Sequence, residues 1–146
     1  MYGLVEIDGQ KYVERFTAIP QDVTISAGLV ILTSQRIVLP GIAPFLLKGW
    51  GRSVIAAAAP ATNAFRFKFG NSDGGTWYTT AGVGGLNDRV MDTLILGTGQ
   101  FPFPVIPHIW YGANSAITYE IEDISNAPTY IIHMVAYGSF LLPYQG

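Results

Sequence analysis

The two histidines of the chain, His108 and His133, are the first residues to test for metal binding or proton transfer. A metal site in a cupin-like β-barrel needs several histidines and a carboxylate that converge on one cavity. His108 stands in a proline-rich stretch, where we expect a surface or packing side chain, and His133 stands in an apolar run, where we expect a core or interface side chain. Two histidines with no acid beside them do not make a metal site, so we predict no metal and no cofactor.

Glu120, Glu122 and Asp123 are closely spaced acids, and a glycosidase works with a pair of carboxyl groups. Those two groups must face each other across a cleft. Glu120 and Glu122 instead share one face of an expected strand, whose opposite face carries Ile117, Tyr119 and Ile121. We therefore interpret these acids as the solvent side of an amphipathic strand.

Other catalytic patterns are absent from the sequence. The chain has no cysteine, which excludes a thiolate nucleophile, a cysteine-ligated metal and a disulfide scaffold, and it has no Gly-x-Ser-x-Gly elbow. Asn71–Gly75 has a single acid where a calcium loop needs several, so we interpret it as a turn, and Gly82–Gly85 lacks the Lys-Ser/Thr of a phosphate loop. We predict that the protein is not an enzyme and has no catalytic residues. A cupin-like enzyme is the least favoured alternative.

Aromatic side chains are the remaining chemical resource, because several stand in or beside expected loops. Exposed rings can stack on sugars, and they are also enriched in protein–protein contacts. The proline-held segment Phe101–Pro107 would lose little entropy on docking, because it is already extended. We therefore expect a protein–protein interface, with glycan binding as the alternative. The candidate interface residues are Trp50, Trp77, Tyr78, Phe101, Phe103, Trp110 and Tyr111.

The charge content also favours burial against other proteins. Asp, Glu, Lys and Arg make up 12% of the chain, against about 25% in an ordinary soluble domain. A surface this poor in charge is expected to be covered by neighbouring subunits, as in a dimer or trimer, although uncharged polar residues offer another way to cover it. No Lys or Arg follows Arg89 and the net charge is −2, so we expect no nucleic-acid partner.

The apolar runs are too short for a membrane span. The longest, Val54–Pro60, falls far below the roughly 18 to 20 residues that a spanning helix needs. The first residues carry acids where a signal peptide would carry basic residues. We expect a protein made in the cytoplasm and kept without a membrane partner.

Period-two patterns, broken by 17 Gly and 9 Pro, dominate the elements that must position these residues. Thr62–Phe69 alternates Phe with Arg and Lys, and Ser115–Glu122 alternates in the same way, as half-buried strands do. Pro128–Leu142 has apolar residues at both odd and even positions, which favours a central strand buried on both faces. Leu86–Leu96 could hold a short helix and is left open. Further strands are expected at Lys11–Ile19, then after a turn at Pro20–Asp22 at Val23–Leu32, and at Gln35–Leu39 and Ala43–Trp50.

About eight strands at turn spacings typical of sandwiches predict an all-β fold. The length suits one domain, residues 1–146. A middle that does not look like simple hairpins favours a jelly-roll-like β-sandwich, with an immunoglobulin-like topology as the alternative.

The order of features resembles the small jelly-roll or β-sandwich accessory proteins of tailed-phage virions, the cement or decoration proteins of the capsid. The resembling segments are Phe16–Ala18, Asp22–Gly28, Phe45–Gly49, Phe65–Phe69, Pro104–Pro107 before Ser115–Ile121, and Ala136–Ser139. The resemblance implies a structural role on the capsid surface, a homo-oligomer, and the major capsid protein as partner. Similar sandwiches occur in tail and fibre-base proteins, so a tail- or fibre-associated receptor- or glycan-binding module is the alternative.

Overall fold

The computed structural model describes residues 2–28, 30–56, 65–72, 90–91, 96–97, 102–125 and 128–145. These residues form nine β-strands and no helix, which confirms the all-β prediction. The strands are β1 (Tyr2–Ile7), β2 (Gln10–Ile25), β3 (Ile31–Val38), β4 (Phe45–Ala56), β5 (Phe65–Gly70), β6 (Val90–Met91), β7 (Phe103–Tyr111), β8 (Ala116–Asp123) and β9 (Tyr130–Pro143).

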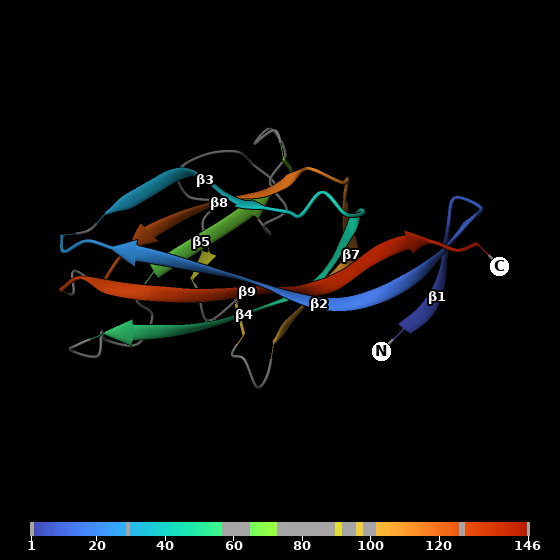
Figure 1. Ribbon diagram of the computed structural model, residues 1–146. Coiled ribbons are helices and arrows are strands. Elements are labelled where there is room, and N and C mark those ends of the chain that lie inside the picture. The colour runs from blue at the N-terminus through green and yellow to red at the C-terminus, as the bar shows by residue number, and fades with distance from the viewer. Residues whose placement is uncertain are drawn as a thin grey trace.

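The strands form two packed layers (Figure 1). Sheet A has the order β1-β2-β9-β4-β7, and sheet B has the order β3-β8-β5-β6. The antiparallel pairs are nested, because β2 pairs with β9, β3 with β8, β4 with β7 and β5 with β6. This is the pairing of one long hairpin that is folded over on itself, with β2–β5 as its first half and β6–β9 as its second half. It is a jelly roll, as predicted, rather than an immunoglobulin-like sandwich.

The core between the sheets follows from alternation along β5 and β8. Phe65, Phe67 and Phe69 are all buried and face sheet A, as their spacing predicts. Ile121 and Tyr119 of β8 lie opposite Phe67 and Phe69, and they are equally buried, as is Ile117. Trp50 of β4 closes the other side of the core, with ring centroids 5.4 Å from Phe67 and 5.3 Å from Phe69.

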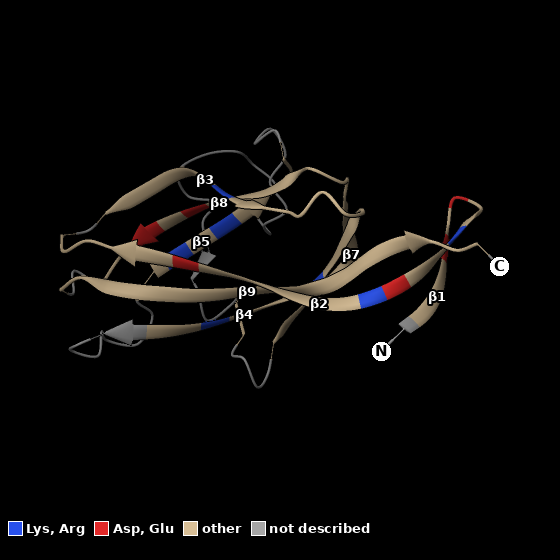
Figure 2. Cartoon of the chain, in the orientation of Figure 1, with Lys and Arg blue, Asp and Glu red and all other residues tan. Residues whose placement is uncertain are grey.

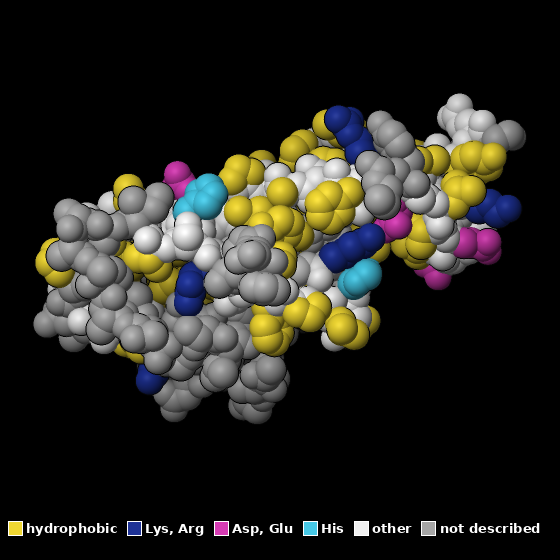
Figure 3. Space-filling view, turned by 90° about the horizontal axis from the view of Figure 1, so that it is seen from below, with side chains coloured by type: hydrophobic (Ala, Val, Ile, Leu, Met, Phe, Trp, Pro, Cys, Tyr) yellow, Lys and Arg dark blue, Asp and Glu magenta, His cyan; other side chains and the backbone are white. Residues whose placement is uncertain are grey.

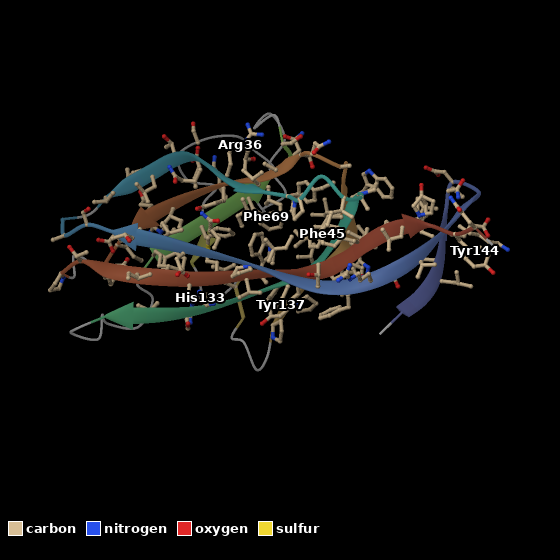
Figure 4. The ribbon with its side chains drawn as sticks, viewed as in Figure 1. Arg36, Phe45, Phe69, His133, Tyr137 and Tyr144 are labelled. Carbon is tan, nitrogen blue, oxygen red and sulfur yellow. The ribbon has the colours of Figure 1, made fainter. Side chains whose placement is uncertain are left out.

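The prediction for β9 is confirmed in position but wrong for one face. β9 lies at the centre of sheet A, between β2 and β4. Its inward residues, from Tyr130 to Ala136, are fully buried, whereas Ile131, His133, Val135 and Tyr137 are partly exposed. Sheet B covers only one face of sheet A, so the outward residues keep access to solvent. Figure 4 shows Phe45 and Phe69 between the sheets, and His133 and Tyr137 on the opposite side of sheet A.

The predicted turn at Pro20–Asp22 is wrong, because β2 runs unbroken from Gln10 to Ile25. Pro20 is opposite Val135 of β9, while β1 pairs only with the first residues of β2, up to Arg15. At Pro20 the strand therefore has one neighbour among the described strands, and a proline is tolerated where no ladder hydrogen bond is needed. The chain turns at Gly28 instead, which has a φ of 98°, so the expected strand Val23–Leu32 is divided between β2 and β3.

The other strand predictions overlap observed strands. Gln35–Leu39 lies mostly in β3, Ala43–Trp50 begins β4, and Ser115–Glu122 matches β8. Residues 62–64 of the predicted strand Thr62–Phe69 lie outside the described residues, and the rest is in β5. In the segment Leu86–Leu96, which could have held a short helix, residues 90–91 form β6 and Leu96 is buried in the core. Most of the predicted turn Asn71–Gly75 and all of Gly82–Gly85 lie outside the described residues.

β1 and the ends of β2 and β9 that lie beside it project beyond the sandwich, together with both termini (Figure 1). We call this three-stranded extension the arm. β1 and β2 are joined by Asp8 and Gly9, whose φ values of 50° and 79° are those of a tight hairpin turn of Asp-Gly type. Leu4 of the arm is 64% exposed, since sheet B does not reach it.

Candidate interaction surface

The prediction that Trp50 and Tyr111 are interface residues is wrong. Trp50 is fully buried and Tyr111 is 3% exposed, and both point into the core. The Tyr111 hydroxyl donates a hydrogen bond of 2.8 Å to the carbonyl oxygen of Gly70. Their positions next to glycines suggested loops, but both residues lie on the inward parity of β4 and β7, where large rings fill the space between the sheets.

Phe103 and Trp110 of β7 are exposed by 42% and 41%, so their side chains are accessible for binding. Trp110 faces away from the core, opposite Leu46. Phe103 lies opposite the buried Trp50 but at the border of sheet A, because β7 is its last strand. Trp77, Tyr78 and Phe101 lie outside the described residues.

The face of sheet A that points away from sheet B is an exposed surface, and we call it the outer face. Residues directly opposite one another share a face of an antiparallel sheet. One cross-strand row is Phe16, Ser139, Leu46 and Trp110, and another is Asp22, His133 and Ser53. The apolar residues of the outer face are Phe16, Ala18, Pro20, Leu46, Trp110, Ile131, Val135, Tyr137 and Leu141.

Charges are sparse on the outer face. β7 and β9 contain no Asp, Glu, Lys or Arg, and Figure 2 shows few charged residues along the strands of sheet A. In Figure 3, which views the molecule from the sheet A side, hydrophobic side chains spread across the middle of this face. The exposed side of an antiparallel sheet normally carries polar residues. This one is largely apolar.

Among the described residues, two contacts join polar side chains on the outer face. Lys48 Nζ is 2.6 Å from Glu14 Oε1, with about a quarter of each side chain exposed. His133 Nδ1 contacts Asp22 Oδ1 across β9 and β2. We expected His133 in the core or at an interface, and the structure places it half-exposed on the outer face.

The outer face curls at the end next to the arm. Tyr12 of β2 and Trp110 of β7 make an edge-to-face contact with ring centroids 5.9 Å apart, although β9 and β4 lie between their strands in the sheet. The curl covers residues that would otherwise be exposed, since Leu46 is 8% exposed and Leu141 is fully buried. It forms a groove of about 440 Å³ lined by Ile7, Asp8, Gln10, Tyr12, His108 and Trp110 together with Leu46.

An irregular segment of β7 carries His108 to this groove. Leu47 is opposite Ile109 and Gly49 is opposite Pro104, so residues 105–108 of β7 bulge out against the single residue Lys48. Pro104, just before the bulge, and Pro107, within it, lack the N–H that regular pairing would need. His108 is exposed, as its proline-rich surroundings predicted.

The acids of β8 form no paired-carboxylate site. Glu122 Oε1 lies 3.2 Å from Arg66 Nη1, and Glu120 Oε1 lies 3.5 Å from Lys68 Nζ. Asp123 faces the core instead, where its Oδ1 accepts hydrogen bonds of 2.7 Å from the hydroxyls of Tyr130 and Ser125. Within the described ranges, no group of three or more His, Asp and Glu residues gathers in a way that could hold a metal ion.

The groove was not predicted, because it depends on Tyr12, which stands in an ordinary strand pattern 98 residues before Trp110. Comparison of the chain with protein-family models, with curated proteins and with solved structures found no match. The described residues hold no helix long and apolar enough to cross a membrane.

Proposed function

We propose that this protein is a structural virion protein, a cement or decoration subunit that stabilises a capsid by contact with copies of itself and with the major capsid protein. The observation that carries the proposal is the outer face of sheet A. It is largely apolar, its Lys48–Glu14 ion pair and its His133–Asp22 contact are internal, and its strands β7 and β9 contain no Asp, Glu, Lys or Arg. An exposed apolar surface of this kind is typical of a protein that is covered in its working state.

The outer face has the chemistry of an interface centre. Phe16 is 58% exposed and Ile131 is 36% exposed, so both have apolar area left to bury. A standard interface buries roughly 800 Å² on each partner, which is about a tenth of this chain's 7921 Å² of accessible surface. One face of a five-stranded sheet is large enough to supply that area.

The arm offers a second kind of contact. β1 pairs with β2 on one side and has no partner on its other side among the described strands. Its free N–H and C=O groups can pair with a strand of a neighbouring subunit. Leu4 lies opposite Val13 and adds exposed apolar area next to that edge.

A cement protein stabilises a shell because many copies of it bind to the same shell. Each subunit adds one interface, and binding that is specific for the assembled shell stabilises the shell by mass action. The test is to purify virions made with this gene, to identify the protein in them by mass spectrometry, and to measure its self-association by sedimentation velocity. Virions without the protein, together with a monomer at every concentration, would rule the proposal out.

A further inference from the structure

The groove beside the arm contains a fixed aromatic platform. Trp110 is 41% exposed, so part of its indole ring is open to a ligand. The edge-to-face contact with Tyr12 holds that ring in one orientation. A platform held in this way loses little conformational entropy when a ligand stacks on it.

Hydrogen-bonding groups surround this platform. Asp8, Gln10 and His108 line the same groove and are all exposed. The tight turn places the backbone of Asp8 at a φ of 50°, and Gln10 Nε2 donates a hydrogen bond of 3.0 Å to the carbonyl oxygen of Lys11. A carboxylate accepts hydrogen bonds, while an amide and an imidazole can both donate and accept, so together they match groups that do both.

The composition of the groove disfavours an anionic ligand. Its lining includes one carboxylate and no Lys or Arg, which disfavours phosphate and other anions. Its volume of about 440 Å³ falls within the roughly 300 to 1,000 Å³ of small-molecule sites. A pyranose ring has an apolar C–H face that can stack on indole and a rim of hydroxyl groups that donate and accept hydrogen bonds.

We propose that this groove binds a neutral sugar, with the apolar face of the ring on Trp110 and its hydroxyl groups on Asp8, Gln10 and His108. This inference does not rest on the proposed function, because the site is complete within one chain. It adds a ligand-binding activity at the end of the outer face next to the arm, where Trp110 belongs both to the outer face and to the groove.

The test is an array of immobilised neutral hexose and N-acetylhexosamine oligosaccharides, probed with the full chain. Multivalent display is chosen because a single sugar site binds weakly. We expect binding of at least one glycan, a loss of at least tenfold with Trp110→Ala and a several-fold loss with Asp8→Asn. Phe103→Ala is the matched control, since Phe103 lies on the same strand, has 42% exposure against 41%, and does not line the groove. It should bind as the wild type does.

Two outcomes on the glycan array would overturn the sugar site. One is an array with no signal, and the other is a signal that both Trp110→Ala and Phe103→Ala reduce equally. A panel of proline-rich peptides is probed in parallel, and Trp110-dependent binding of a peptide without binding of any glycan also contradicts the proposal. If Trp110→Ala lowers the melting temperature, the Asp8→Asn variant decides, because Asn tolerates the left-handed turn conformation at this exposed position.

Discussion

Gly138 of β9 lies directly against Leu46 of β4, so that a Cβ on Gly138 would stand 2.1 Å from the Leu46 carbonyl oxygen and 2.7 Å from Cζ of Phe45. Backbone cannot move away there without breaking the pairing of β4 and β9. We therefore expect Gly138→Ala to lower the free energy of unfolding by about 3 kcal/mol.

Urea denaturation measures that loss. Gly112→Ala is the matched control, because a Cβ on Gly112 meets no atom within 4 Å, and it should change stability little. Equal stabilities for the two variants would contradict the close approach of β4 and β9 at this point.

The ion pairs of β5 predict a contrast between neighbouring positions. The side chains of Lys68 and Glu120 are 7% and 14% exposed, whereas Arg66 is 46% exposed in its pair with Glu122. Lys68→Met leaves the largely covered Glu120 carboxylate without this cation, so we expect a loss of about 3 kcal/mol. Arg66→Met removes a solvent-screened pair and should cost less than about 1 kcal/mol. Chemical denaturation of both variants measures the two losses of stability. A larger loss for Arg66→Met than for Lys68→Met would contradict the prediction.

Burial raises the pKa of Tyr119 above its ordinary value of 10.0, although its hydrogen bond with Gln21 acts in the opposite direction. The folded state therefore holds this proton more tightly than the unfolded chain does. Stability from this group is fully present below pH 10 and is lost as the pH rises toward the folded pKa. We expect the urea midpoint to fall above pH 10 less steeply in Tyr119→Phe than in the wild type. An identical pH dependence in both proteins would show that Tyr119 does not contribute.

The fold was largely predictable because alternation reports burial directly. Phe65, Phe67 and Phe69 identified the core face of β5, and the apolar run of β9 identified the central strand. The prediction failed at Pro20, where a local turn signal was outweighed by long-range pairing with β9. Which part of a strand lacks a second neighbour is decided by sheet order, and no local pattern contains that information.

The interaction surface was predictable only in part. Aromatics near glycines and prolines looked alike in sequence, yet Trp50 fills the core while Trp110 faces out. The difference is one of strand parity, which the bulges in β4 and β7 shift. The groove was not predictable, because the curl of sheet A brings Tyr12 to Trp110 from strands that are not neighbours.

The outer face of sheet A is tested by one pair of variants. Phe16→Asp places a charge on the outer face, where Phe16 is 58% exposed. Val38→Asp places the same charge on β3 of sheet B, where Val38 is 74% exposed. Both positions are open to solvent, so both variants should fold and lose similar amounts of strand propensity.

The proposed capsid role is tested most directly by co-sedimentation, which measures the binding of each variant to capsid shells that lack this protein. We expect the wild type and Val38→Asp to bind alike, and Phe16→Asp to lose at least tenfold in affinity because its charge would have to be desolvated in an apolar interface. Equal binding of Phe16→Asp and Val38→Asp, or no binding of the wild type, would contradict the assignment of the outer face as the surface by which this protein binds a capsid.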